Sequence, residues 1–306
     1  ASTSGQLLPP ILGLAAFIIA AYLNMAYIEV ALAALLPAIL YLISLVISIL
    51  IVSRAHNLPY PEVDVDTKKI IHLAPTFIIG LGIVLVLLLL YYSPNLSAIL
   101  GLLGALIASA FQGKELRPTV KSIKDSFLDG LELVTILCLL LIAIGPIAQM
   151  ATTTNLATHL NIILSRIVPD ILFIILFGAM VISLLLGMGL PTPVAYLVVA
   201  LTMTPFLQQS GVDALTAHMF VFYFAVFSTI SPPVAISCLA ASKISGDSFA
   251  FTAYEAIKLA LPTFIIPFCF VYNPELLSFP QVSYSTIHAF FITILCQFLM
   301  IVSLYG

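Results

Sequence analysis

The amino-acid sequence predicts an all-α integral membrane protein with about eight to ten membrane-embedded helices. Of its 306 residues, 62% are hydrophobic and 8% are charged, whereas soluble domains hold about 45–50% and about 25%. A membrane-spanning helix needs roughly 20 apolar residues. Long runs contain no Asp, Glu, Lys or Arg, among them residues 70–113, 133–165, 171–212, 214–242 and 276–306. Gly, Pro and hydroxyl residues interrupt some of these runs, which predicts helices that break inside the bilayer.

Charge and motif content exclude several classes of function. The chain has 10 Lys and Arg against 13 Asp and Glu, so it lacks the basic excess that nucleic-acid binding requires. Its sequence has no Gly-x-x-x-x-Gly-Lys-Ser/Thr phosphate loop, so the energy source must be an ion gradient or a partner. The four cysteines and five histidines are scattered, without Cys-x-x-Cys or His-x-x-x-His spacing. We therefore expect no cofactor, no transition-metal centre and no enzymatic activity.

The embedded segments follow one another along the chain. The first four are predicted as helices and the later ones as embedded stretches of apolar sequence. In order they cover 7–25, 29–52, 70–92 and 95–111, then 131–168, 170–210, 214–246, 254–273 and 284–304.

The break Ser93-Pro94-Asn95 joins two apolar helices and predicts a simple hairpin over 70–111. The loops at 53–69 and 112–130 then lie on one side of the bilayer. They hold seven of the ten basic residues: Arg54, Lys68, Lys69, Lys114, Arg117, Lys121 and Lys124. By the positive-inside rule, this side is the cytoplasm.

Residues 112–130 also show the pattern of an amphipathic helix. Four apolar residues recur there at helical spacing, with charged residues turned away from them: Leu116, Val120, Ile123 and Phe127. Such a helix would lie on the bilayer surface. The alternative is a soluble linker with accidental periodicity.

Two parts of the chain share a pattern of breaks. Leu8-Pro9-Pro10-Ile11 opens a stretch that passes a polar break and reaches Leu36-Pro37, and Ser231-Pro232-Pro233-Val234 opens another that reaches Leu261-Pro262. The Pro-Pro pairs lie 223 residues apart and the later prolines 225 apart. Because secondary transporters are commonly built from inverted repeats, this pattern predicts two repeats.

The repeat gives a division of the chain into six segments. They are the end of a first repeat (1–52), a cytoplasmic loop (53–69), the helical hairpin (70–111), an amphipathic interfacial linker (112–130), the second repeat (131–273) and a C-terminal membrane helix (274–306).

Three stretches combine Gly or Pro with hydroxyl residues: Ser2–Pro10, Gly187–Pro193 and Ser228–Pro233. Proline lacks an amide donor and leaves a carbonyl one turn earlier unpaired, and in hydrocarbon such a group must find protein, water or an ion. Freed carbonyls and hydroxyls are neutral oxygen ligands suited to a hard monovalent cation, and half-helix N-termini offer amides to a carboxylate. The alternative is that the breaks merely kink packed helices, with the hydroxyls bonded to their own backbone.

Embedded charges are few and lie near predicted helix ends, where structural roles are expected. They are Glu29, Glu132, Lys243, Glu255 and Lys258. The polar segment 145–155 is predicted as either the tip of a re-entrant hairpin or an exposed loop.

At these residues the chain resembles the fused large (DctM-like) permease of tripartite ATP-independent periplasmic (TRAP) transporters, in the branch that works with TAXI-type binding proteins. Four stretches carry the resemblance, which extends over nearly the whole chain: residues 1–10, 187–196, 218–235 and 267–274. Two departures stand out. The family often shows Ser-Thr-Gly-Gly-Gln where this chain has Ser2-Thr3-Ser4-Gly5-Gln6, and the stretch 145–158 is unlike the usual Gly-rich turn.

The resemblance implies an ion-transporter-superfamily fold with two inverted repeats, broken helices and re-entrant hairpins. It implies import of a small organic acid or similar solute across a bacterial or archaeal cytoplasmic (inner) membrane, with Na⁺ or H⁺ as the coupling cation. The implied partners are a periplasmic TAXI-type substrate-binding protein and a small four-helix membrane subunit or a fused equivalent. The binding residues carried over are Ser2, Thr3, Ser4 and Gly5, then Gly187, Gly189, Pro191 and Thr192, and finally Ser228, Thr229, Ser231 and Pro232.

The nearest alternative is a binding-protein-independent Na⁺/dicarboxylate or citrate symporter of the same superfamily. A membrane-embedded enzyme or a purely structural membrane subunit is a more distant one. The chain has no initiator Met and ends in apolar sequence. We therefore expect the C-terminal portion of a longer permease, with most of the first repeat absent and no transport by this chain alone.

Overall fold

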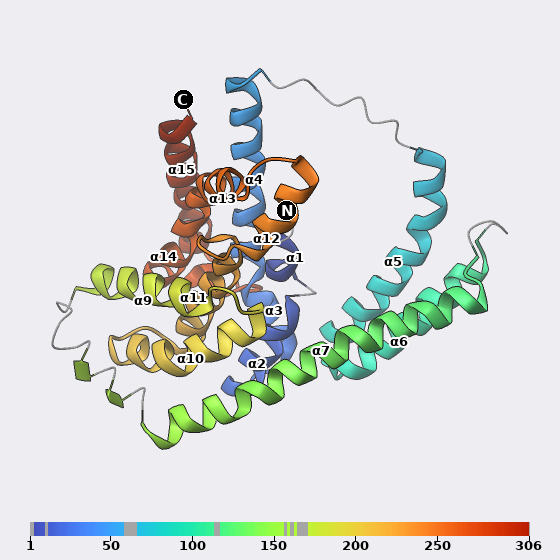
Figure 1. The fold of residues 1–306 in the computed structure, drawn as a ribbon, viewed down its shortest axis with the longest axis horizontal. Coiled ribbons are helices and arrows are strands. Elements are labelled where there is room, and N and C mark those ends of the chain that lie inside the picture. The colour runs from blue at the N-terminus through green and yellow to red at the C-terminus, as the bar shows by residue number, and fades with distance from the viewer. Residues whose placement is uncertain are drawn as a thin grey trace. The chain divides into compact units, whose positions relative to one another are not determined.

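The computed structural model of the chain describes residues 3–9, 12–57, 66–112, 117–155, 158–159, 162–163 and 171–305 (Figure 1). The chain divides into two compact units, which we describe separately. Unit 1 consists of Ala1–Met25, Glu29–Leu58 and Ala143–Gly306, and unit 2 of Ala26–Ile28 and Pro59–Ile142.

Unit 2 is built on a helical hairpin of α5 (Thr67–Leu89) and α6 (Pro94–Ala110). The Ser93 hydroxyl accepts a hydrogen bond from the Leu96 amide at 3.4 Å, and Pro94 occupies the first helical turn. Ser is a favoured N-cap and Pro is tolerated where its missing amide has no helical partner. The helices predicted at 70–92 and 95–111 are therefore present, with ends shifted by no more than three residues.

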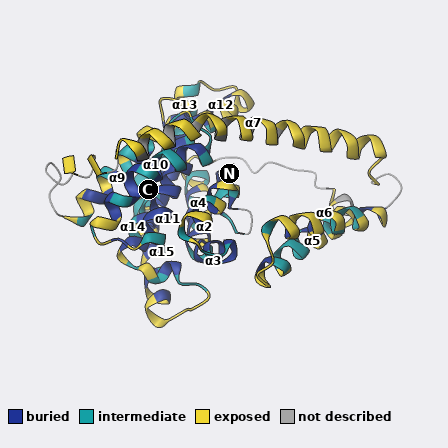
Figure 2. Ribbon diagram, turned by 90° about the horizontal axis from the view of Figure 1, so that it is seen from below, coloured by how far each residue is buried: buried dark blue, intermediate teal, exposed yellow. Residues whose placement is uncertain are grey.

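Small residues allow α5 and α6 to pack closely. A Cβ atom added to Gly80 would lie 2.9 Å from the Ala105 Cβ, and one added to Gly101 or Gly104 would collide with a side chain of α5. Glycine at such positions lets two helix backbones approach in a membrane, where packing rather than the hydrophobic effect drives helix association. Most other side chains of the hairpin are exposed, as expected for a lipid-facing pair (Figure 2).

One helix, α7 (Val120–Thr153), crosses the boundary predicted at residues 130 and 131. Its 34 residues correspond to about 51 Å at 1.5 Å per residue, which exceeds the roughly 30 Å hydrocarbon thickness. The segment 145–155 is neither a loop nor a hairpin tip over most of its length, because the helix continues through Pro146 to Thr153. The turn comes at Thr154 and Asn155, where Asn155 has a φ of 49°. Whether residues 120–130 lie at the bilayer surface stays a prediction.

Unit 1 contains the remaining described helices. In order they are α1 (Ser4–Leu7), α2 (Gly13–Leu23), α3 (Tyr27–Ala33, apart from its first two residues), α4 (Leu35–Ala55), α9 (Leu172–Gly187), α10 (Thr192–Gln209), α11 (Ala214–Phe227), η1 (Ser228–Ile230), α12 (Ile236–Ser245), α13 (Phe249–Ala260), η2 (Leu261–Phe264), α14 (Ile265–Tyr272), η3 (Pro274–Leu277) and α15 (Tyr284–Tyr305).

The helix α11 lies at the centre of unit 1. Every residue from Thr216 to Phe227 is buried (Figure 2), as expected for a helix that is apolar on all sides. It contacts α1, α2, α9, α10 and α14. Aromatic rings fill part of this core. For example, the ring centroids of Phe224 and Phe227 lie 5.7 and 4.6 Å from the ring centroid of Phe264.

Several predicted helices are interrupted where proline breaks the hydrogen-bond ladder. The stretch predicted at 29–52 divides into α3 and α4 around Ala34, because Pro37 has no amide to donate to the carbonyl of Ala33. The stretch at 254–273 begins earlier, at Phe249, and passes through a 3₁₀ turn at Pro262. The predicted helix 7–25 is also divided, because α1 ends at Leu7 and α2 begins at Gly13.

The break pattern that suggested a repeat recurs in the helix ends. The helices α2 and α12 begin at Gly13 and Ile236, which are 223 residues apart. They end at left-handed caps, Asn24 and Gly246, which are 222 residues apart. Asn and Gly tolerate this backbone conformation best. The two stretches therefore share a sequence of break, helix, left-handed cap and helix, while their inverted relation stays a prediction.

The described residues are helical wherever they form regular structure, and several helices could span a bilayer. Four are long and apolar enough by themselves: Leu35–Ala55, Ile70–Leu89, Phe249–Tyr272 and Tyr284–Tyr305. The pair α2 and α3, bent by 116°, would form a fifth as one broken span. Other apolar helices are shorter, including α9, α11 and α12. The predicted all-α integral membrane fold is confirmed, with full spans accompanied by short apolar segments.

Candidate functional site

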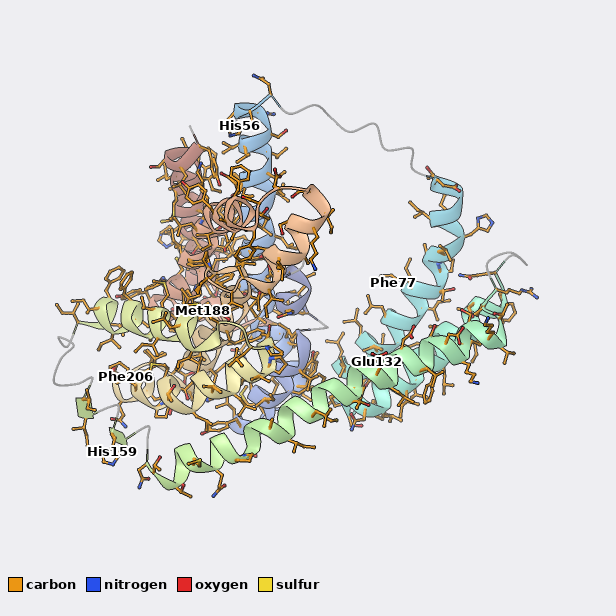
Figure 3. The ribbon with its side chains drawn as sticks, in the orientation of Figure 1. His56, Phe77, Glu132, His159, Met188 and Phe206 are labelled. Atoms are coloured by element: carbon orange, nitrogen blue, oxygen red, sulfur yellow. The ribbon has the colours of Figure 1, made fainter. Side chains whose placement is uncertain are left out.

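The second predicted break forms the tip of a helical hairpin. The helix α9 ends at Gly187 and α10 begins at Thr192, and these two helices pack against each other. The turn starts at Met188, which is labelled in Figure 3. Gly189 has a φ of 77°, a conformation that costs glycine little and other residues more. Pro191 sits at the N-cap of α10 with a φ of −58°, which suits the start of a helix.

The third predicted break follows the buried helix α11. The chain leaves η1 at Ser231, passes the exposed Pro232, and enters α12 after Ala235. The hydroxyls of Ser228, Thr229 and Ser231 each donate to a carbonyl oxygen three or four residues earlier, at 2.7–3.0 Å. Each of these hydroxyl hydrogens is therefore bonded to the backbone of its own segment, as the alternative interpretation expected. Their oxygen lone pairs remain as acceptors.

The first predicted break lies around the short helix α1. The Thr3 hydroxyl lies 2.7 Å from the Tyr41 hydroxyl of α4. Ser4 is half-buried, and a Cβ at the exposed Gly5 would meet nothing within 4 Å. Ser2 lies outside the described residues.

Two close contacts bring the three breaks together. The Thr192 hydroxyl donates to the side-chain carbonyl oxygen of Gln6 at 2.7 Å, which joins the second break to the first across 186 residues of sequence. A Cβ at Gly187 would lie 2.5 Å from the Ser228 Oγ, so the second break also touches the third. The helix α1 contacts α11 as well. The three segments that the sequence marks independently therefore meet at one place in the structure.

The predicted residues divide by burial. Five of them are buried: Thr3, Gly187, Thr192, Ser228 and Ser231. Gly5, Gly189 and Pro232 are exposed, and the remaining described ones are intermediate. Sequence analysis missed Gln6 and Tyr41 as site residues. Gln6 stood inside a marked stretch, whereas Tyr41 belongs to another helix and no sequence signal pointed to it.

The site offers neutral oxygen atoms. Its three segments, residues 3–9, 187–193 and 228–235, contain hydroxyls, backbone carbonyls and the Gln6 amide but no Asp or Glu. Neutral oxygens fit a monovalent hard cation better than a divalent one, which usually recruits carboxylates. Across the part of the chain that the structure describes, no group of three or more His, Cys, Asp or Glu could hold a metal ion.

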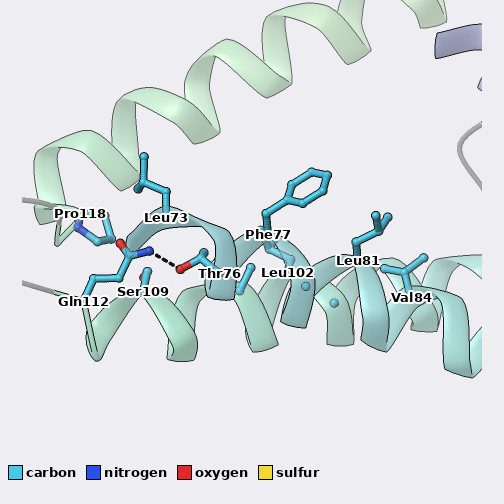
Figure 4. A pocket seen from close by; sticks show the side chains of 12 residues that line it. Leu73, Thr76, Phe77, Leu81, Val84, Leu102, Ser109, Gln112 and Pro118 are labelled. Atoms are coloured by element: carbon cyan, nitrogen blue, oxygen red, sulfur yellow. Dashed lines mark hydrogen bonds between the residues drawn. The ribbon is translucent and has the colours of Figure 1, made fainter. Parts of the chain in front are cut away.

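A separate groove lies along the hairpin of unit 2 (Figure 4). It has a volume of about 620 Å³ and contains none of the predicted site residues. Apart from Gln112, which donates to the Thr76 hydroxyl and to the His72 carbonyl, its lining is mostly apolar. An open apolar groove on an exposed helical pair is the surface expected to face lipid.

An all-α chain with helices long and apolar enough to span a bilayer, and with broken helices that meet at neutral oxygen atoms, has the architecture of an integral membrane transporter. More narrowly, the chain belongs to the DctM family: the family model described as "Tripartite ATP-independent periplasmic transporter, DctM component" matches residues 1–283. The helix α15 lies beyond this match. A search of curated proteins found no match. DctM proteins are multi-pass membrane permeases that generally work with a periplasmic binding protein and a small membrane subunit.

Proposed function

We propose that this chain is part of a permease that imports a small organic acid or similar solute, fed by a periplasmic TAXI-type binding protein. A Na⁺ or H⁺ gradient drives the import, across a bacterial or archaeal cytoplasmic membrane. The observation that carries the proposal is the convergence of three broken segments through the Gln6–Thr192 hydrogen bond and the Gly187–Ser228 contact.

Na⁺ is the cation that suits this site best. The hydroxyl hydrogens at the third break are bound to carbonyls, so their lone pairs can face a cation. The helix α10 begins at Thr192, and the positive end of its helix dipole favours a carboxylate near the same place. A cation and an anionic solute can therefore bind as neighbours, which is the usual basis of symport.

Substitution of two hydroxyl residues tests the cation site. We expect Thr192→Ala and Ser231→Ala to raise the Na⁺ concentration for half-maximal uptake by roughly tenfold, because each removes one oxygen from the site. Thr204→Ala is the matched control, since Thr204 is buried in α10 and bonds back to the Ala200 carbonyl at 2.6 Å, away from the breaks.

The assay is uptake of a radiolabelled solute by the complete transporter in proteoliposomes, with protein abundance measured in parallel. Unchanged Na⁺ dependence in both site variants would refute this assignment of the cation site. Uptake that proceeds equally well without any binding protein would instead support a binding-protein-independent symporter.

A further inference from the structure

A buried histidine lies on α11, outside the predicted site. His218 is fully buried and lies ten residues before Ser228, the residue that follows the end of α11, or about 15 Å along the helix axis. Its Nδ1 atom lies 2.6 Å from the hydroxyl of Tyr196. Tyr196 stands one turn after Thr192 on α10. The Tyr196–His218 pair therefore joins the two helices that carry the second and third breaks.

The hydrogen-bond requirements of this pair leave one group unmatched. The Nε2 atom of His218 is buried and has no hydrogen-bond partner. When the Tyr196 hydroxyl donates to Nδ1, both of those groups are satisfied and the neutral ring carries its hydrogen on Nε2. The opposite tautomer would leave two groups unmatched, namely the Tyr196 hydroxyl hydrogen and the Nε2 lone pair. The pair thus presents one free N–H donor.

Such a donor is costly in an apolar interior. The neighbours of His218 along α11 include Phe220 and Phe222, which fill their places without any polar requirement. Another phenylalanine at this position would avoid the unmatched donor. A partner that binds transiently and accepts a hydrogen bond from this N–H group would also remove the free-energy cost of the unmatched donor.

One aromatic ring covers the histidine on the side of α2. The Tyr22 ring centroid lies 5.0 Å from that of His218, with the two planes inclined by 52°. Tyr22 is itself 56% exposed. Because α2 follows the first break, the three residues come from the three elements adjoining the three breaks. None of these helices, Gly13–Leu23, Thr192–Gln209 and Ala214–Phe227, contains Asp or Glu, so no acidic side chain on them would repel an anion.

We propose that the Nε2–H group of His218 binds the transported solute by donating a hydrogen bond to a carboxylate or carbonyl oxygen, and that the Tyr22 ring moves aside to admit it. This inference rests on the proposed function and adds a solute-binding residue to it. The solute oxygen and the cation have separate ligands, because His218 lies about three turns of α11 from the third break.

Two substitutions at one position distinguish solute binding from structural support. His218→Asn keeps a polar atom near Nδ1, where Tyr196 bonds, and removes the donor at Nε2. His218→Gln places an amide donor near Nε2 and gives up the bond to Tyr196. We expect His218→Asn to raise the solute KM roughly tenfold with the maximal rate unchanged, because ground-state and transition-state binding are lost equally. His218→Gln should stay within about threefold of the wild-type KM.

The measurement uses radiolabelled succinate, malate, 2-oxoglutarate and citrate with the complete transporter, together with thermal unfolding of the purified permease with each acid or with Na⁺. A bound solute raises the unfolding temperature by mass action. At one acid concentration, His218→Asn should show a smaller shift with the acid than the wild type and keep the shift caused by Na⁺.

The results separate this inference from the proposal on which it rests. If no acid is transported or stabilises the wild-type protein, both fail. If the wild type responds and His218→Asn responds equally well, only the role of His218 is refuted. An equal loss in the Asn and Gln variants would also refute it, since it would indicate a structural contribution.

Discussion

Gly187 provides the sharpest test of the convergence of the breaks. In Gly187→Ala, the added Cβ would lie 2.5 Å from the Oγ and 2.8 Å from the Cβ of Ser228, whereas ordinary contacts are 3.4–4 Å. The end of α9 and the η1 turn must therefore separate by several tenths of an ångström or more. Overpacking of this kind costs roughly 1–3 kcal/mol.

A second glycine of the same helix serves as the control. A Cβ added to Gly178, in the interior of α9, would meet nothing within 4 Å. Gly178→Ala should therefore stabilise the helix by about 0.5–1 kcal/mol, because alanine loses less conformational entropy on folding. The two substitutions make the same chemical change, and we expect their effects on stability to have opposite signs.

The assay is thermal unfolding of the purified protein in lipid nanodiscs, with all variants heated at one rate. Gly187→Ala should unfold below the wild type and Gly178→Ala above it. Adding Ser228→Gly to Gly187→Ala removes both colliding atoms and should recover part of the loss, and this coupling is the direct signature of contact. A Gly187→Ala protein as stable as the wild type would refute the close approach of α9 to η1.

Two further predictions concern other contacts. Gly101→Ala should destabilise the α5–α6 hairpin by roughly 1–3 kcal/mol, because its Cβ would collide with Val84. The control is Gly82→Ala, whose Cβ would meet nothing within 4 Å and which should not destabilise the hairpin. Equal unfolding temperatures for the two variants would contradict this packing. A double-mutant cycle of Gln6→Leu and Thr192→Val should give a coupling of about 1 kcal/mol for their hydrogen bond, measured by the same unfolding assay, and additive effects would show that the bond contributes nothing.

Local signals in the sequence predicted the parts of the fold that depend on near neighbours. The hairpin of α5 and α6 follows from two apolar runs and one turn at Ser93-Pro94-Asn95. The breaks at Gly189 and Ser231 likewise come where glycine, proline and hydroxyl residues were found. Backbone chemistry decides such features within a few residues.

Composition was a poorer guide to the extent of α7. The prediction placed a boundary at residues 130 and 131, between a charged amphipathic segment and an apolar one. In the structure, one helix continues through this boundary. A helix needs no uniform polarity along its length, and neither Gly130 nor Pro146 ends this one. Proline weakens a helix locally without always ending it.

The contacts that assemble the candidate site could not be predicted. Thr192 and Gln6 are 186 residues apart, and Thr3 and Tyr41 are 38 apart. Residue type and spacing indicated which segments had ligands to offer, and the weak repeat indicated that two of them correspond. Their meeting depends on how α11 packs against α1, α9 and α10, which no local pattern contains.

The hydroxyls of the third break have an electrical consequence for the transport cycle. Because Ser228, Thr229 and Ser231 bond their hydrogens to carbonyls, the site attracts a cation through oriented dipoles and needs no net charge. In the proposed cycle, a carrier with an empty site moves no charge there, whereas each bound Na⁺ adds one positive charge to those of the solute. A membrane potential contributes about 2.3 kcal/mol per elementary charge per 100 mV, so it would act on the loaded step through the sum of the Na⁺ and solute charges, while leaving the return of the empty carrier nearly independent of voltage.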